Sequence, residues 1–241
     1  MFRSLNDLFG YGINAVDGPA GSVYDFYFDD VLWAVRYVVA DTGVILPGRK
    51  VLLAPQTITE ADWASRLLSL PHTQQEIREG PSREEDKPVS RQEEEELHEY
   101  YQWAPYWAPG VPFGAAPVPP PPVHPEDLGE VPEGDPHLRS MREVSGYALV
   151  AEDGQIGHIE DFVADDETWT LRMVVIDTRN WLRGKKVAFS PHWIDRIDWG
   201  GKMAKTLLKQ DQIRNAPEFD PAEPVNEELE VRLYDYYGRP H

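Results

Sequence analysis

Alternating hydrophobic and polar residues, broken by short turns rich in Gly, Asp and Pro, run through most of this chain. The clearest stretch is WAVRYVVA at Trp33–Ala40, where alternate residues such as Val35 and Tyr37 share one face of a predicted strand. Three further strands are predicted around it, at Tyr11–Val16, Ser22–Phe28 and Lys50–Leu53. Several short strands separated by turn residues predict a small, mainly β barrel or sandwich.

This pattern occurs twice. The stretch at Trp33–Pro55 returns at Trp169–Pro191, at an offset of 136 residues without insertion or deletion. Matching pairs extend on both sides, from Arg3-Ser4 and Arg139-Ser140 near the two starts to Tyr100-Tyr101 and Tyr236-Tyr237 near the two ends. Roughly 30 of about 80 pairs between positions 2 and 81 are identical. A period this long indicates two related domains, because solenoid repeats are only about 20–50 residues long.

The repeat and the composition predict three segments. Residues 1–105 form copy 1 with an acidic and aromatic tail, residues 106–136 a Pro-rich linker, and residues 137–241 copy 2 with a Tyr-rich tail. The linker is expected to be an extended polyproline II spacer. Each copy has about 100 residues, which is enough for a core of its own. Because both copies keep one register, we expect them to pack as a pseudo-two-fold pair.

After Pro55 the two copies are less alike. Residues 61–70 could be helical if taken alone, but their register with copy 2 favours a strand–turn–strand in both. A short helix is then predicted at residues 72–79 and again at 209–215. The charged segment 84–102 is expected to be mobile or helical.

Composition excludes several classes of function. The net charge of −19 and the pI near 4.7 argue against direct binding of nucleic acid or anionic lipid. The chain has no Cys, which excludes disulfides, thiol catalysis and Cys-ligated metal. No run approaches the about 18 apolar residues of a membrane span, and none at the start has the length of a signal peptide. We therefore expect a soluble cytoplasmic protein.

Several of these motifs resemble the PRC-barrel family. They are Trp33-x-Val-Arg-Tyr-x-Val-x-Asp-Thr-Gly43, Leu46-Pro-Gly-Arg-Lys-Val-Leu53, the Asp17-Gly18-x-x-Gly21 hairpin and the tail LYDYYGRP at Leu233–Pro240. The resemblance implies two six-stranded β-barrels, each with a short C-terminal helix. It implies no catalytic residue and no cofactor, because family members act as docking or assembly domains.

Two relatives in that family suggest different partners. The cytoplasmic domain of the photosynthetic reaction centre H subunit caps a membrane complex, and this chain resembles it without its membrane helix. A divergent barrel in a ribosome-maturation factor binds a ribosomal protein. The first hypothesis is therefore a non-enzymatic docking module for a protein partner, peripheral to an inner-membrane complex of reaction-centre type. The alternative is an accessory factor in ribosome or RNA metabolism that acts through a protein, and an enzyme is the least favoured class.

Aromatic residues supply the candidate interaction site. Exposed aromatic side chains at the end of a module are frequent anchors of interfaces. They crowd the end of copy 1 and the end of copy 2, at Tyr100, Tyr101, Trp103, Tyr106, Trp107, Tyr234, Tyr236 and Tyr237. Two alternatives remain open: each tail folds back onto its own barrel, or the two tails meet.

Charged residues inside the repeat predict structural roles. Arg36 and Arg172 lie in apolar strands, and a buried arginine needs an acidic partner, for which Asp25 and Asp161 are the candidates. The alternative places these arginines on an outer face.

Two other sets of polar residues are assigned no catalytic chemistry. The doubled acids Asp29-Asp30 and Asp165-Asp166 are interpreted as turn residues in preference to a cation site. The seven histidines have no metal-ligand spacing and are expected at the surface.

Overall fold

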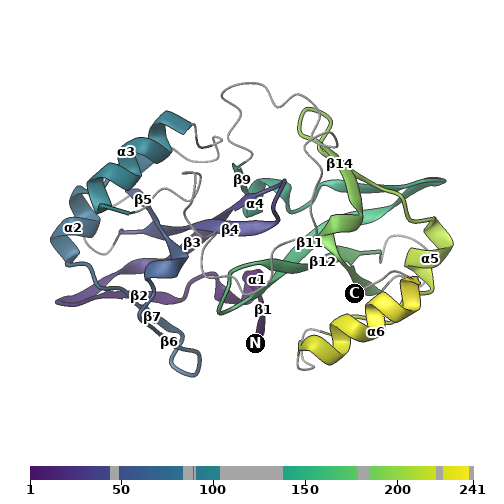
Figure 1. Ribbon diagram of the computed structural model, residues 1–241, viewed down its shortest axis with the longest axis horizontal. Coiled ribbons are helices and arrows are strands. Elements are labelled where there is room, and N and C mark those ends of the chain that lie inside the picture. Colours follow the sequence, from purple (N-terminus) through teal and green to yellow (C-terminus); the bar gives the residue numbers. More distant parts are fainter. Residues whose placement is uncertain are drawn as a thin grey trace. The chain divides into compact units, whose positions relative to one another are not determined.

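The chain is mainly β and forms two β-rich units (Figure 1). The computed structural model describes residues 1–43, 49–83, 89, 91–103, 138–178, 185–220 and 225–238. Unit 1 comprises Met1–Leu8 and Met141–His241, and unit 2 comprises Phe9–Ser140. The predicted linker, residues 106–136, lies outside the described residues.

Unit 2 is built around one mixed sheet. Its strands are β2 (Gly12–Ala15), β3 (Gly18–Asp29), β4 (Ala34–Asp41), β5 (Lys50–Leu53), β6 (Glu60–Asp62), β7 (Leu67–Ser69), β8 (Ser82–Arg83) and β9 (Leu138–Ser140). Their order is β6-β7-β2-β3-β4-β5-β8, and β9 pairs with β3. The pair β2–β7 is parallel and the others are antiparallel. The helices are the 3₁₀ turn η1 (Pro55–Thr57), α2 (Gln74–Glu79) and α3 (Arg91–Tyr101).

Unit 1 repeats this plan. Its strands are β1 (Phe2–Ser4), β10 (Ala148–Ala151), β11 (Gly154–Asp165), β12 (Leu171–Asp177), β13 (Lys186–Phe189), β14 (Ile194–Asp198) and β15 (Met203–Thr206). Their order is β13-β12-β11-β10-β15-β14, and β1 pairs with β11. The helices are α1 (Leu5–Leu8), α4 (Met141–Val144), the 3₁₀ turn η2 (Pro191–Trp193), α5 (Gln210–Arg214) and α6 (Glu227–Tyr237).

The predicted secondary structure is confirmed where the two copies are less alike. Strands β6 and β7 in unit 2, and β14 and β15 in unit 1, form the expected strand–turn–strand. The short helices α2 and α5 follow them at the expected positions. In the charged segment, the described residues from Arg91 onward form the helix α3.

The repeated Asp-Gly hairpin anchors the short helix in each unit. The carboxylate of Asp17 accepts a hydrogen bond from the backbone N of Gln74 at 2.7 Å, and Asp153 accepts from Gln210 at 2.8 Å. An acidic side chain at the start of a helix satisfies backbone amides that have no partner within the helix. The Asp17-Gly18 motif therefore positions α2 as well as the turn between β2 and β3.

A repeated glycine lets two long strands approach closely. Gly21 has φ +149°, and a Cβ built there would lie 2.3 Å from the backbone O of Asp41. Gly157 has φ +158°, and its Cβ would lie 2.4 Å from the O of Asp177. Only glycine fits such a position without backbone movement. This explains why the residue recurs at an offset of 136.

The core of each unit lies around its two central strands. In β4 every residue from Ala34 to Ala40 is buried. Both faces of the strand that the alternating pattern predicted are therefore covered by other parts of the unit. In β12, five of the seven positions that form the strand are buried hydrophobics. The largest enclosed side chains include Tyr37, Phe26 and Phe28 in unit 2, and Phe162 and Phe189 in unit 1.

The starting segment of each copy belongs to the unit formed by the other copy. Strand β1 pairs with β11 in the register Phe2↔Asp165, Arg3↔Ala164 and Ser4↔Val163. Strand β9 pairs with β3 in the equivalent register Leu138↔Asp29, Arg139↔Phe28 and Ser140↔Tyr27. The predicted contiguous copies, 1–105 and 137–241, are therefore corrected at their first residues. Local sequence could not reveal this, because a three-residue strand pairs equally well with either of two related sheets.

Candidate interaction site

Helices α3 and α6 occupy equivalent places at the ends of the two copies and carry most of the predicted aromatic residues. Tyr100 Oη donates to the backbone O of Glu76 in α2 at 3.0 Å. Tyr236 Oη donates to the backbone O of Gln212 in α5 at 2.9 Å. Each C-terminal helix therefore lies beside the short helix of its own unit, as Figure 1 also shows.

The next tyrosine in each helix points inward. Tyr237 is only 5% exposed and packs against Trp193, with ring centroids 4.9 Å apart. Tyr101 is half-buried and lies against His72, with ring centroids 4.9 Å apart and an interplanar angle of 54°. Burial raises the pKa of both tyrosines, Tyr101 and Tyr237, well above the usual value. These aromatic rings hold each tail on its own unit, which was the alternative that the sequence left open.

The remaining predicted anchors divide in the same way. Tyr234 is half-buried, and its hydroxyl donates to Ser190 Oγ at 3.1 Å. Tyr100 and Tyr236 stay 40% and 39% exposed. Tyr106 and Trp107 lie outside the described residues. Of the eight candidates, Tyr100 and Tyr236 are thus the two described residues with large exposed rings.

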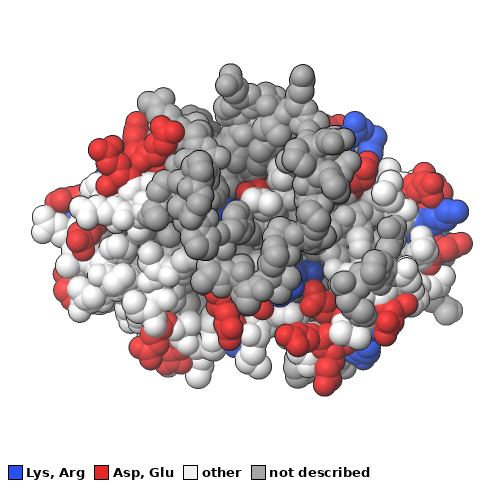
Figure 2. All heavy atoms as spheres, in the orientation of Figure 1, with Lys and Arg blue, Asp and Glu red and all other residues white. Residues whose placement is uncertain are grey.

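Exposed acidic side chains lie on both helices that carry the exposed tyrosines. On α3 the exposed residues beside Tyr100 are Glu93, Glu95, Glu96 and Glu99, and Figure 2 shows acidic side chains gathered over α2 and α3. On α6 the exposed acidic residues are Glu227, Glu228 and Asp235, and the exposed Arg232 lies one turn before Tyr236. Burial, Glu79 and Glu76 raise the pKa of Tyr100, because nearby negative charge disfavours the phenolate. We call the exposed faces of α3 and α6 the two acidic tyrosine faces.

A buried polar cluster lies beneath α3. Tyr37 Oη donates to Glu94 Oε1 at 2.8 Å and lies 3.0 Å from His98 Nε2. Glu94 and His98 are 0% and 8% exposed. The positions equivalent to Tyr37 and His98 in copy 2 are Met173 and Tyr234. The cluster is therefore specific to unit 2, and it shows that His98 is not at the surface as the sequence suggested.

The first aspartate of each doubled pair has the predicted turn role, whereas Asp30 and Asp166 each lie near an arginine. Asp29 Oδ1 accepts from the backbone N of Val31 and of Leu32 at 3.0 and 2.9 Å. Asp165 Oδ1 does the same with Glu167 and Thr168. This arrangement, in which an aspartate bonds amides two and three residues ahead, stabilises a tight turn.

The ion pair predicted between Asp161 and Arg172 is wrong. Arg172 Nη2 lies 3.9 Å from Asp165 Oδ2, and Nη1 lies 4.0 Å from Glu230 Oε1. The antiparallel register places Asp161 opposite Val175, away from Arg172. The acid near the end of the hairpin is therefore the one within reach.

In copy 1 the equivalent pair is Arg36 and Asp29. Arg36 Nη2 donates to Asp29 Oδ2 at 3.1 Å, and Arg36 is only 6% exposed. The arginine is therefore inside the unit and not on an outer face. Asp25, the partner expected from the sequence, accepts from Ser140 Oγ at 2.5 Å.

The contacts that sequence reasoning missed lie where the starting segments cross over. Ser4 Oγ donates to Asp161 Oδ2 at 2.5 Å, as Ser140 does to Asp25. Arg3 Nε lies 2.9 Å from Asp166 Oδ2, and Arg139 Nε lies 3.6 Å from Asp30 Oδ2. All eight residues form matched pairs in the repeat, which is the signal that could have suggested a shared role. Nothing in the pattern showed that each dipeptide contacts the other copy.

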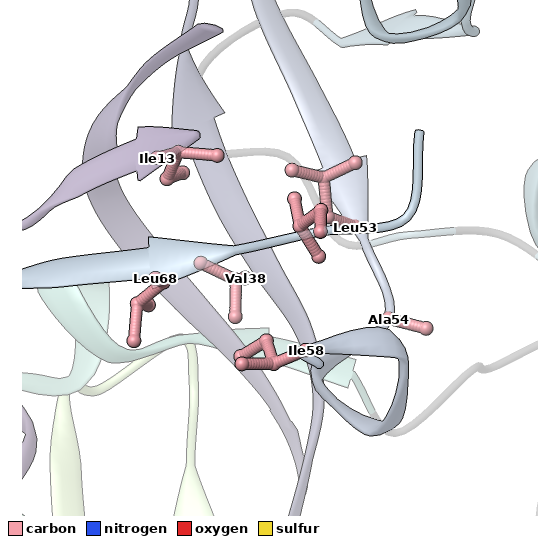
Figure 3. A pocket seen from close by; sticks show the side chains of 7 residues that line it. Ile13, Val38, Leu53, Ala54, Ile58 and Leu68 are labelled. Atoms are coloured by element: carbon pink, nitrogen blue, oxygen red, sulfur yellow. The ribbon is translucent and has the colours of Figure 1, made fainter. Parts of the chain in front are cut away.

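A small cavity in unit 2 has room for about one water-sized molecule (Figure 3). Its lining is wholly apolar, from Ile13, Val38, Leu53, Ala54, Ile58, Leu68 and Leu70. Within the described residues there is also no cluster of three potential metal ligands, and no helix has the length and hydrophobicity to cross a membrane.

Comparison with known proteins adds no assignment. No family model matches the chain, and no curated protein matches it.

Proposed function

We propose that this chain is a non-enzymatic docking protein of the PRC-barrel type, whose two acidic tyrosine faces bind one protein partner at two places. The observation that carries the proposal is the equivalent placement of Tyr100 and Tyr236. Both rings are about two-fifths exposed, and both hydroxyls are anchored to the preceding short helix. An aromatic ring held in one orientation loses little conformational entropy when a partner covers it.

The repeated strand order supports the part of the proposal that concerns the fold. In both units the same six-strand path runs through equivalent strands, from β6 to β5 in unit 2 and from β14 to β13 in unit 1. A short helix follows the last of these strands in sequence. This agrees with the six-stranded barrel and C-terminal helix that the resemblance implies, and closure of each sheet into a barrel is part of the proposal.

The chemistry of the faces indicates a basic partner. Exposed carboxylates lie on both helices, most densely around Tyr100, and the chain carries a net charge of −19. Lys and Arg side chains on a partner could pair with the carboxylates and lie over the tyrosine rings as cation–π contacts. Two such sites on one chain raise the effective concentration for the second contact, so moderate contacts give tight binding.

The proposal includes a cytoplasmic location and attachment to a protein surface of a membrane complex. The family resemblance to the reaction-centre H subunit suggests that kind of partner. The partner would be recognised through its protein surface, because the acidic faces repel both nucleic acid and anionic lipid.

Affinity capture from native cells, with membrane and soluble fractions kept apart, tests the proposal. The bait is the full chain or the double variant Tyr100→Ala/Tyr236→Ala. Val16→Ala, which changes an exposed residue outside both faces, serves as the matched control. We expect a stoichiometric partner with the wild type and the control, at least tenfold less with the double variant, and weaker capture at high salt.

The identity of the captured protein decides between the hypotheses. Subunits of a membrane complex support docking of the reaction-centre type. Ribosomal proteins support the alternative role in ribosome metabolism. Equal capture by all three baits contradicts a role for the tyrosine faces.

A further inference from the structure

A strand-acceptor site on unit 1 holds residues 1–8. Its backbone part is β11, with which Phe2–Ser4 pairs in antiparallel register. Two carboxylates bind side chains of this segment: Asp166 accepts a hydrogen bond from Arg3, and Asp161 accepts one from Ser4. A strand added to a sheet in this way gains affinity from its backbone and specificity from its alternate side chains.

Helix α1 extends the same site. The backbone N of Asn6 donates to Asp161 Oδ1 at 3.1 Å, and Asn6 Nδ2 donates to the O of Glu160 at 3.0 Å. Leu5 and Leu8 are 0% and 1% exposed. The acceptor site therefore recognises an Arg-Ser dipeptide followed by one helical turn with two buried leucines.

Unit 2 contains a second site for the dipeptide, which already accepts Arg139-Ser140 from the other copy. Ser140 donates to Asp25, and Arg139 lies beside Asp30. The acceptor carboxylates of the two units, like the two dipeptides, are equivalent in the repeat. The contacts thus recognise the Arg-Ser dipeptide itself. They do not depend on whether the dipeptide belongs to the same copy as the acceptor sheet.

We propose that the site on unit 1 also binds residues 1–8 of a second copy of this chain, so that two chains form a dimer by exchanging these segments. The chain passes from unit 1 to unit 2 between Leu8 and Phe9, so only β1 and α1 have to detach. Each contact of the segment is then remade in the other chain. The dimer and the monomer differ mainly in effective concentration, and exchange of identical elements is a low-cost route to symmetric dimers.

The inference does not depend on the proposed docking function. Exchange uses Asp161, Asp166 and the strand β11, whereas docking uses the exposed tyrosines of α3 and α6. Loss of partner capture in the tyrosine variants therefore leaves the exchange untested, and loss of exchange leaves docking intact. The two proposals fail separately.

Because the chain has no Cys, a disulfide can report the exchange directly. Arg3 and Ala164 are opposite each other in the register, within the Cα separation that a disulfide spans. A chain with Arg3→Cys is mixed with a differently tagged full chain with Ala164→Cys. The mixture is unfolded, refolded over a range of protein concentrations and oxidised. A disulfide between these two chains forms only when the segment of one enters unit 1 of the other.

We expect a covalent heterodimer whose yield rises with protein concentration. Ala164 is 1% exposed, so random collision does not reach it. Arg3→Cys mixed with Asp195→Cys, an exposed position elsewhere in unit 1, is the control and should give no concentration-dependent product of this kind.

A second measurement does not depend on cysteine variants. Isotope-labelled and unlabelled wild-type chains are refolded together, and native mass spectrometry records mixed dimers. Absence of mixed dimers together with absence of the heterodisulfide, at all concentrations up to several hundred micromolar, overturns the proposal. Equal heterodisulfide yields with Ala164→Cys and Asp195→Cys overturn it as well, because they indicate random contact.

Discussion

The hydroxyl of Ser4 donates to the carboxylate of Asp161, a residue 157 positions later in the chain, with Oγ and Oδ2 2.5 Å apart. The equivalent bond joins Ser140 to Asp25 at the same distance. In both cases the serine comes from one copy of the repeat and the aspartate from the other. Each unit is therefore complete only when both copies have folded.

Replacing Ser4 by alanine should destabilise the protein measurably. The change leaves one oxygen of the buried Asp161 carboxylate without its hydroxyl donor, which typically costs about 1–3 kcal/mol. The free energy of unfolding in urea provides the measurement. Ser22→Ala, at a half-buried strand position, is the control and should change it by less than about 0.5 kcal/mol. Equal effects of the two variants would show that the Ser4 bond contributes nothing.

Stability should fall as the pH rises from about 4 to about 7. Burial raises the pKa of Asp161 to about 7, although hydrogen bonds from Ser4, Asn6 and Phe162 oppose the shift. The folded state therefore binds this proton more tightly than the unfolded state, whose pKa is near 3.8. The stabilisation from this group is fully present below the unfolded pKa and is lost as pH rises through the folded one.

The comparison of wild type with Asp161→Asn isolates that contribution. The amide does not ionise, so the variant should lose the part of the pH dependence between about 4 and 7 that Asp161 supplies. Urea unfolding at several pH values measures it, with Asp195→Asn at an exposed position as the control. Parallel stability curves for wild type and Asp161→Asn would contradict the raised pKa.

Removing one buried hydroxyl from each C-terminal helix should be neutral or stabilising. Within the described residues, the hydroxyls of Tyr101 and Tyr237 are buried and have no hydrogen-bond partner. A buried polar group without a partner costs roughly 1–3 kcal/mol, so Tyr101→Phe and Tyr237→Phe should raise the thermal midpoint or leave it unchanged. Tyr100→Phe and Tyr236→Phe, which lose a hydroxyl bond to a backbone carbonyl, are the matched comparison. Their thermal midpoints should be lower than those of the inward pair.

Cutting the chain between the two copies should not separate them. A protease site placed within residues 106–136 divides the chain into a piece with Phe2–Ser4 and a piece with Leu138–Ser140. Each of these strands pairs in the unit formed mainly by the other piece. We expect the two pieces to elute together in size-exclusion chromatography after cleavage of the folded protein. Separate elution under native conditions would show that the exchanged strands do not hold the copies together.

Much of the local structure could be predicted from the sequence. Alternation in the stretch Trp33–Ala40 indicated β4, and the register of the repeat correctly favoured strands over a helix at residues 61–70. The turn role of Asp29 followed from the preference of aspartate for bonding nearby amides. These features depend on contacts a few residues apart or on the repeat, both of which can be read along the chain.

The aromatic candidate site was predicted only as a set of residue types. Helical geometry turns neighbouring residues by about 100°, so Tyr236 faces outward while Tyr237 packs against Trp193. Composition cannot separate such neighbours before the helix and the surface that it covers are known. The choice between a free anchor and a packed tail therefore required the fold.

The sequence by itself determined that this protein is a tandem repeat of a mainly β module, because periodicity and the offset of 136 are written in the residues. Only the tertiary structure decided which copy each Arg-Ser segment completes, and which acid each strand arginine reaches. Both decisions rest on contacts between distant residues. Two acceptor sheets of nearly equal sequence offer such a segment nearly equal local energies, so chain connectivity and three-dimensional packing select between them.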